Sequence, residues 1–541
     1  MCREPLRRLA AVLLAGAGSL LAGDAAGLLR EFIRAEGSHP NLPYVAQAGH
    51  DGLPLPVRPV AGAVVIPIRP ADPADAVGDD EAISGALRQA RTILDAPGAT
   101  SAVVIALAPG RWRLTRPVFI DRSHLHLRGS GSAATILHFE RPLSKAVVTT
   151  HLTTEQWSFR GGLVWIENGV IPEGLPLNRE VIRIAGEAPA GARTLAIAPA
   201  DEARARALIG RPLFLKTTGG QGWLAQVYGH APTAPRFVRE HWGYLRRDGT
   251  ARFEEAQVML AVDAGRITLA KPIRVAIAQG ATAMLGARQG DIVDASISAL
   301  GIRFPEYERQ PHLKDHGYNG VFVRCGVGVR VEDVAIDQAE NGIMVERSAH
   351  TTLRRTAFTG GKMHHAISLR VVSTDTLVED FAITASVVHG ISVQDLSAGS
   401  VFSRGRMATG TFDSHRGMPF DTVRTEIVIA PWGSAGGAAG PLVGRRMVNW
   451  NVEIRWPKDA WGGDPKSKRK LARESIITGS QWSVMGALVG IRGAEPQPDS
   501  LPWELPPGDK GTIVADWGQV PEPVNLYEAQ RAWWRARDAG R

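Results

Sequence analysis

The 541-residue sequence has few cysteines, and this limits how the folded chain can be stabilised. It contains only Cys2 and Cys325. Cys2 precedes an apolar segment that we expect to be removed, so the mature chain would keep one cysteine and form no internal disulfide. Its stability must then come from a buried core, which a regular stack of strands supplies.

Long hydrophobic runs and blocks of basic residues are also missing. After the N-terminal region, no segment reaches the roughly 18 apolar residues that a membrane span needs. No run of consecutive Lys or Arg marks a nucleic-acid-binding tail, so we expect neither a membrane span nor a nucleic-acid partner. The 62 Lys and Arg exceed the 54 Asp and Glu, which gives a net charge of +8. This mild excess suits an anionic polysaccharide as partner.

The N-terminus has the pattern of a secretory signal peptide. Arg3, Arg7 and Arg8 precede an apolar run, and small residues follow through Ala26. A basic flank, a short apolar core and a small-residue end are typical of such a peptide. We therefore expect residues 1–26 to direct the protein to the periplasm or the medium of a bacterium. The alternative is a buried N-terminal helix.

A repeat of 22 to 24 residues runs through the middle of the chain. Four segments with a small second residue and then alternating apolar positions begin at Asn319, Asn341, His365 and His389. A second strand-like segment recurs between them, every 24 residues from Val329. Two or three short strands per repeat of this length predict a parallel β-helix, in which each coil pairs only with its neighbours.

Alternation along these segments predicts which side chains form the core. Residues of one parity should point inward, namely Val321, Ile343, Ile367 and Ile391. Their neighbours should point outward, namely Phe322, Met344, Ser368 and Ser392.

Two segments near the N-terminus resemble proteins of the pectate-lyase-like superfamily. They are GDDEAISGALRQA, from Gly78, and VIALAPGRWRLTRPVFIDRSHLHLRGSG, from Val104. The resemblance covers residues 75–140 and 290–455. It implies a right-handed parallel β-helix that starts with a capping helix, in a superfamily of polysaccharide lyases, glycoside hydrolases and phage tailspike depolymerases.

The expected fold is therefore all-β. After the signal peptide we expect the cap and first coils at 27–150, an inserted antiparallel β domain at 151–290, the main coils with the site at 291–455, and a Pro/Gly-rich segment with a closing helix at 456–541. The expected insertion contains Trp157, Trp165, Trp223 and Trp242. These rings either stack on sugars or fill the core of the insertion.

Stacking the repeat gathers titratable side chains into one region, because adjacent coils lie about 4.8 Å apart. The column that starts at Asn319 continues, one repeat after His389, to Asp413. We predict catalytic roles for Lys362, His364, His389, Asp413, His415 and Arg416. We predict substrate binding by His316, Glu340, His365, Arg370 and Arg424. The alternative for Asn319, Asn341, His365 and His389 is a structural ladder of hydrogen-bonded and stacked side chains.

Three functions are compatible with these residues. Excess His, Lys and Arg favours a lyase, in which a base removes the C5 proton of a uronate and a cation neutralises its carboxylate. A glycoside hydrolase would instead use two carboxylates, from Asp337, Glu340 and Asp413. The third is a non-catalytic carbohydrate-binding or adhesion β-helix.

We predict no metal and no other cofactor. His364 and His365 are neighbours on a strand, so their side chains should point to opposite faces and should not share a zinc ion. No Asp-rich loop indicates a calcium site, although calcium is left open.

Overall fold

The computed structural model describes residues 24–72, 78–146, 157–169, 177, 181–219, 221–229, 251–311, 313–432, 436–439, 443–456, 483–494 and 511–538. Most of the predicted signal peptide lies outside this part, so export stays a prediction. Within these ranges no helix has the length and hydropathy needed to cross a membrane.

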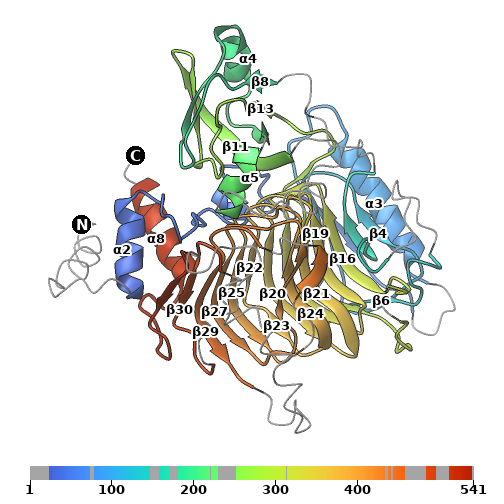
Figure 1. Ribbon diagram of the computed structural model, residues 1–541. Helices are drawn as coiled ribbons and strands as arrows, with labels where there is room; N and C mark the ends of the chain where they lie inside the picture. Colours follow the sequence, from blue (N-terminus) through green and yellow to red (C-terminus); the bar gives the residue numbers. More distant parts are fainter. Residues whose placement is uncertain are drawn as a thin grey trace, which may run out of the picture.

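The body of the protein is the predicted right-handed parallel β-helix (Figure 1). Sheet A runs along it in the order β1 Val64–Ile68, β2 Val103–Leu107, β5 Leu125–Arg128, β15 Ser296–Arg303, β18 Arg330–Asp337, β20 Thr352–Thr359, β22 Leu377–Glu379, β25 Val401–Met407, β27 Val423–Ile429, β29 Val448–Ile454, β30 Ala487–Val489 and β31 Ile513–Ala515. Joined to it are β3 Gly110–Leu114, β6 Thr135–Phe139 and β23 Ala382–Ile383.

Sheet B is the second long parallel sheet. Its order is β28 Gly436–Ala439, β26 Phe412–Arg416, β24 Ser386–Val393, β21 Lys362–Arg370, β19 Asn341–Glu346, β16 Asn319–Arg324, β7 Val164–Ile166 and β4 Val118–Ile120. A short third pairing joins β14 Ile292–Val293 to β17 Gly326–Val327.

Each central coil has one strand in sheet B and one bent strand in sheet A. The bend lies at a residue with positive φ, such as Asp333 at 53°, Arg355 at 51° and Arg404 at 52°. Such values are uncommon outside glycine. Their recurrence once per coil gives every coil the same corner, so the apolar side chains stack in continuous columns.

The second residue of each repeat is small because there is little space for a side chain at this position. A Cβ on Gly320 would lie 2.8 Å from Ile336 Cδ1, and one on Gly342 would lie 2.5 Å from Phe358 Cε1. Ile336 and Phe358 belong to strands β18 and β20 of sheet A, so these glycines face the interior where the two sheets approach most closely. A larger side chain would have to displace the facing strand.

The inserted domain is an antiparallel sheet in the order β8 Ile182–Arg183, β13 Thr282–Gly286, β10 Pro212–Gly219, β11 Ala251–Asp263, β12 Arg266–Leu269 and β9 Thr194–Ala196. Helices α4 Glu202–Ala207 and α5 Gln221–Tyr228 accompany it. Because β7 pairs with β4 and β16, its residues belong to the β-helix and not to the insertion expected at 151–290. Trp157, Trp165 and Trp223 are buried, but in the core of the β-helix rather than in that of the insertion, and Trp242 lies outside the described residues.

Helices close both ends of the stack. At one end, α3 Asp80–Leu94, the predicted capping helix, packs on β1, β2 and β4. At the other end lie α2 Ala25–Arg34 and α8 Leu526–Asp538, side by side (Figure 1). The rings of Phe32 and Trp533 meet there with centroids 5.6 Å apart. The predicted end of the signal peptide, Ala26, falls within the first turn of α2.

Between α2 and β1 the chain runs along the turns of the β-helix, and we call residues 41–58 the N-terminal strap. Asn41 Nδ2 donates to the carbonyl of Gly486 at 3.1 Å. The Gly49 amide donates to the Asp375 carbonyl at 2.8 Å, and the Arg58 amide donates to Asp294 Oδ2 at 3.0 Å. The strap thus contacts coils from β30 back to β14.

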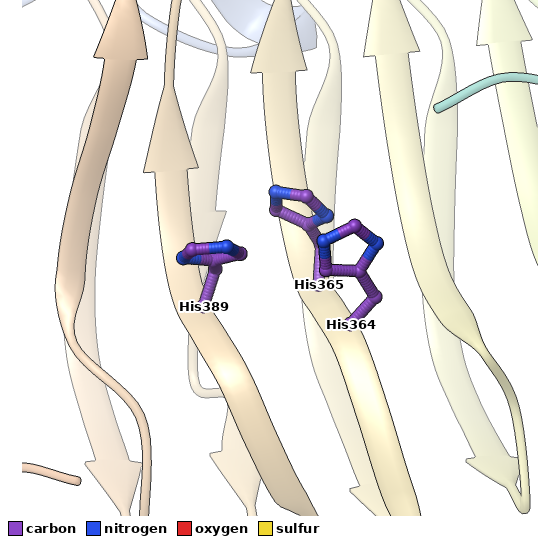
Figure 2. A group of neighbouring side chains, drawn as sticks. All are labelled: His364, His365 and His389. Atoms are coloured by element: carbon purple, nitrogen blue, oxygen red, sulfur yellow. The ribbon is translucent and has the colours of Figure 1, made fainter. Parts of the chain in front are cut away.

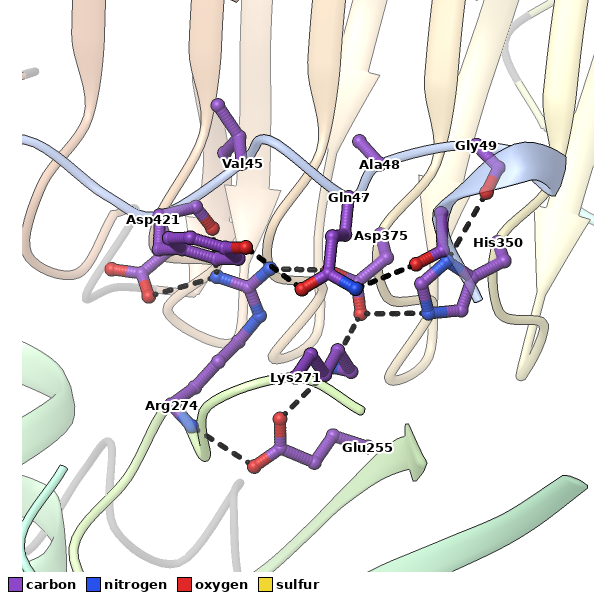
Figure 3. A network of polar contacts seen from close by, with 12 residues as sticks. Val45, Gln47, Ala48, Gly49, Glu255, Lys271, Arg274, His350, Asp375 and Asp421 are labelled. Atoms are coloured by element: carbon purple, nitrogen blue, oxygen red, sulfur yellow. Dashed lines mark hydrogen bonds and ion pairs between the residues drawn. The ribbon is translucent and has the colours of Figure 1, made fainter. Parts of the chain in front are cut away.

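A buried charge network joins the strap, the insertion and the turns (Figure 3). Lys271 Nζ lies 2.8 Å from Asp375 Oδ2 and 3.0 Å from Glu255 Oε2. Arg274 pairs with Asp375 and, at 3.3 Å, with Asp421. Burial opposes ionisation of Asp375, but Arg274 and Lys271 outweigh it and hold its pKa below the usual range. This network fixes the insertion against the coils.

Candidate functional site

The predicted column of Asn and His forms a continuous ladder on sheet B. Asn319, Asn341, His365 and His389 are in register on four successive strands. Asn341 Nδ2 donates to Asn319 Oδ1 at 3.0 Å, and His365 Nδ1 lies 3.3 Å from Asn341 Oδ1. The rings of His365 and His389 stack with centroids 4.8 Å apart. These four residues therefore have the contacts of the structural ladder.

The ladder is covered by residues 157–161, which we call the covering segment. Asn319 Nδ2 donates to the carbonyls of Trp157, at 2.8 Å, and Gly161, at 3.1 Å. Arg370 donates to the Phe159 carbonyl, and its guanidinium lies 5.4 Å from the centre of the Phe159 ring. The cover explains a departure from the sequence prediction. The outward row of Phe322, Met344, Ser368 and Ser392 is buried rather than exposed.

His364 joins the ladder at its side (Figure 2). Its ring centroid lies 4.4 Å from that of His365 and 5.4 Å from that of His389. The prediction that His364 and His365 diverge is therefore wrong. Imidazoles extend well beyond Cβ, so side-chain torsions bring together rings whose Cβ atoms diverge. We call His364, His365 and His389 the histidine cluster. All three are at most 3% exposed.

Two carboxylates approach the cluster. Asp413 Oδ1 lies 3.3 Å from His389 Nδ1, and Asp315 Oδ2 lies 3.5 Å from His364 Nδ1. Burial lowers the pKa of His364, and the bond to Asp315 opposes this effect. Asp315 is a residue that the sequence analysis missed, because it lies in a loop outside the repeat.

The register of Asp413 differs from the prediction. It pairs with Ser392 rather than with His389, since this coil is 21 residues long, from Ser392 to Asp413, and not 24. Ser392 Oγ donates to Asp413 Oδ2 at 2.8 Å. The Asp413 carboxylate nevertheless lies close to His389, with Oδ1 3.3 Å from Nδ1.

Glu340 and Arg424 do not present free groups to a substrate. The Glu340 carboxylate accepts the backbone amides of His316, Gly317 and Tyr318, so it caps a turn. Arg424 lies on β27 of sheet A, 2% exposed, with its guanidinium 5.1 Å from the centre of the Phe412 ring. The sequence places both near the column but does not show that they are enclosed.

The other predicted residues lie around the cluster. Lys362 is exposed at the beginning of β21, and the side chain of His316 is partly exposed. His415 and Arg416 end strand β26, and their side chains are outside the described part of the structure. Asp337 lies on sheet A, where Thr359 donates to it at 2.7 Å and Arg303 pairs with it at 3.2 Å.

A second column of charged side chains lies on the same face, at the other end of the strands. Strand pairing aligns Glu346 with Arg324 and with Arg370. Because Ile166 pairs with Val323, Glu167 precedes Arg324 in this column, and their charged groups are 3.7 Å apart. Burial raises the pKa of Glu167 to about 7. The sequence analysis missed Glu167, because the coil that contains this residue precedes the long insertion.

The histidine cluster is the one metal-compatible grouping of three His, Cys, Asp or Glu side chains among the described residues. Each ring offers one nitrogen, and the three nitrogens lie within 4.8 Å of one another. Nitrogen ligands suit zinc and related transition metals, whereas calcium prefers oxygen.

No protein-family model matches the sequence, and no curated protein matches it either. Several solved structures have a similar fold. The tailspike protein of Pseudomonas phage LKA1 is 10% identical, with a TM-score of 0.34, over 75% of this chain and 73% of the tailspike. DFA-IIIase from Arthrobacter chlorophenolicus is 13% identical, with a TM-score of 0.34, over 78% and 77% of the two chains.

A third similar structure is the catalytic domain of a GH87 α-1,3-glucanase in complex with tetrasaccharides. It is 8% identical, with a TM-score of 0.34, over 87% of this chain and 68% of the glucanase. Likeness at these identities concerns the fold alone.

Proposed function

We propose that the protein is an exported enzyme that cleaves an acidic polysaccharide by β-elimination, with its reaction centre at the histidine cluster. The observation that carries this proposal is the convergence of three imidazoles and two carboxylates on one face of sheet B. A rigid sheet that holds perturbed titratable groups together is what acid–base catalysis needs.

Elimination from a uronate requires a proton acceptor, a cation for the carboxylate and a proton donor for the leaving oxygen. The histidine cluster and exposed Lys362 supply nitrogen groups of the first and third kinds, whereas Arg370, the predicted cation of the second kind, lies at the other end of β21. The covering segment lies over the histidines, so a substrate reaches them only when this segment moves or from its edge near Lys362.

The alternative hydrolase has less support from geometry. Of its three carboxylates, Glu340 is committed to three backbone amides and Asp337 to Arg303 and Thr359. Of these three, Asp413 alone lies at the cluster, and the second carboxylate there, Asp315, faces His364 Nδ1 at 3.5 Å. A retaining or inverting hydrolase needs two carboxyl groups across one glycosidic bond.

The test is a panel of acidic polysaccharides assayed both for the ultraviolet absorbance of unsaturated uronate ends and for new reducing ends. We expect both signals from the wild type and a loss of about 100-fold or more in His389→Ala and Lys362→Ala. His138→Ala, on strand β6 of sheet A, is the matched control and should retain activity. Reducing ends without the absorbance would contradict elimination and favour hydrolysis. Saturable binding with neither signal would favour a carbohydrate-binding β-helix.

A further inference from the structure

The three rings of the histidine cluster share a second feature besides their proximity. In each ring, Nδ1 faces an oxygen atom of the protein. His364 Nδ1 lies 3.5 Å from Asp315 Oδ2, His365 Nδ1 lies 3.3 Å from Asn341 Oδ1, and His389 Nδ1 lies 3.3 Å from Asp413 Oδ1. The Asn341 oxygen is the atom that faces His365, because the Asn341 amide nitrogen donates to Asn319 Oδ1.

The contact at His365 has hydrogen-bond geometry, and those at His364 and His389 are at ion-pair distance. Together they favour the tautomer that carries its proton on Nδ1. An Nδ1–H that donates to an oxygen leaves the lone pair on Nε2, which is the form of imidazole that binds a metal ion. Metal-ligating histidines almost always donate their other N–H to a carboxylate or carbonyl oxygen, and this partner orients the ring. All three histidines have such a partner, and two of the three partners are carboxylates.

We propose that His364, His365 and His389 together bind one divalent transition-metal ion, with zinc as the best match. Three imidazoles with one further position open are the ligand set of catalytic zinc sites. The nitrogens of tetrahedral zinc ligands are about 3.4 Å apart, given zinc–nitrogen bonds of about 2.05 Å. The observed limit of 4.8 Å exceeds this, and the rings of His365 and His389 are stacked, so these rings must turn about their side-chain torsions for all three to ligate.

Burial and rigidity favour the site. His364, His365 and His389 are 1%, 3% and 2% exposed, on two adjacent strands of a long sheet. The carboxylates of Asp315 and Asp413 supply negative charge beside the rings, which offsets the charge of the ion.

Zinc binding does not depend on the proposed function, but the role of the ion does. A ligating histidine cannot accept the C5 proton at the same time. If the protein is a lyase, the ion therefore neutralises the uronate carboxylate, and exposed Lys362 becomes the proton acceptor. Lys362→Ala should then abolish elimination and leave zinc affinity unchanged.

The experiment measures zinc directly on the full chain. Purified protein is stripped with a chelator and titrated with zinc against a chromophoric competitor, and the bound metal is counted by mass spectrometry. Cobalt(II) replaces zinc in a parallel sample, where its visible spectrum reports nitrogen ligation at low coordination number. We expect one ion per chain, weakened by at least 100-fold in His389→Ala.

Two further variants keep the test decisive. Asp413→Asn retains the three rings and should weaken zinc by about 10–100-fold, since it removes only the partner that orients His389. His138→Ala removes a buried histidine of sheet A and should bind zinc like the wild type. Circular dichroism checks that each variant is folded.

Each outcome has a clear reading. Absence of stoichiometric zinc in the wild type would overturn the inference and leave a purely structural ladder, whatever the variants do. Zinc binding that survives in folded His389→Ala and Asp413→Asn would overturn the site. Zinc binding that these variants lose, without activity on any acidic polysaccharide, would support the inference and contradict the proposed function. Lyase activity in metal-free protein would support the proposed function and contradict the role given to the ion in it.

Discussion

Glu167 shows how one buried side chain makes stability depend on pH. It is 3% exposed and its charged group lies 3.7 Å from that of Arg324. Burial raises its pKa from 4.5 to about 7, against the opposing effect of Arg324. The folded state thus holds the proton more tightly than the unfolded state. The resulting stabilisation is complete below pH 4.5 and is lost as the pH rises through about 7.

Glu167→Gln should remove this dependence, because glutamine keeps the volume but does not ionise. We expect a gain on the order of 1–2 kcal/mol in the free energy of unfolding at about pH 8, and little change at about pH 4. Urea denaturation at both pH values measures this. An equal effect at both would show that Glu167 does not titrate in this range. Glu140→Gln, at an exposed carboxyl on the opposite sheet, is the control.

At the residue scale the sequence predicted which side chains are neighbours better than it predicted where they point. The repeat placed Asn319, Asn341, His365 and His389 in one column, because strand pairing follows the spacing. It did not predict that residues 157–161 cover them, since that segment has no counterpart in the repeat. Asp315 was missed because it lies in a loop outside the repeat, and Glu167 because its coil precedes the long insertion.

Among the elements, the insertion depends on a small number of buried charges for its position. Asp375 lies in a turn of the β-helix, and Lys271 and Arg274 belong to the chain that follows β12 (Figure 3). His350 is also close, with Nε2 at 3.6 Å from Asp375, and burial lowers its pKa to about 4, so it stays neutral. Asp375 therefore neutralises two buried cations.

Asp375→Asn should destabilise the protein by about 3–5 kcal/mol, because Lys271 is then left with Glu255 alone of the network and Arg274 shares Asp421 with Arg446, so the buried network carries an excess positive charge. Asp95→Asn is the matched control. It removes an exposed pair with Arg122 at 2.8 Å and should cost less than about 1 kcal/mol. Thermal unfolding of both variants provides the comparison. Equal small losses would mean that the insertion is held mainly by apolar contacts.

The order of the elements was predictable where the periodicity is strong and less so where it is interrupted. The capping helix, the central coils and the helix from Leu526 all appear in the sequence as amphipathic or alternating patterns. Strand β7 did not, because three residues between irregular segments give too little alternation to recognise. The strap was not predicted either, since the contacts of Asn41, Gly49 and Arg58 follow no periodic pattern in the sequence.

For the molecule as a whole, Gly49 is the point where the strap lies closest to the coils. Its φ is +88°, and a Cβ would lie 2.8 Å from Thr352 Oγ1 and 3.0 Å from Leu377 Cβ. Gly49→Ala should therefore lift the strap and cost about 1–3 kcal/mol. Gly62→Ala, with φ of +94° but nothing within 4 Å, bears only the backbone strain. Faster unfolding in denaturant of the first variant than of the second would confirm that the strap is held there.

The strap also changes how the stack can come apart. A linear array of coils, each in contact only with its neighbours, can lose coils one after another from either end. Here the segment that leads into the first coil is tied to the last ones, where α2 packs beside α8. Coils at one end can then unfold only when the contacts at the other end also break. We therefore expect the array to unfold in one cooperative step rather than coil by coil. Such a molecule resists proteases through slow unfolding rather than through a large equilibrium stability.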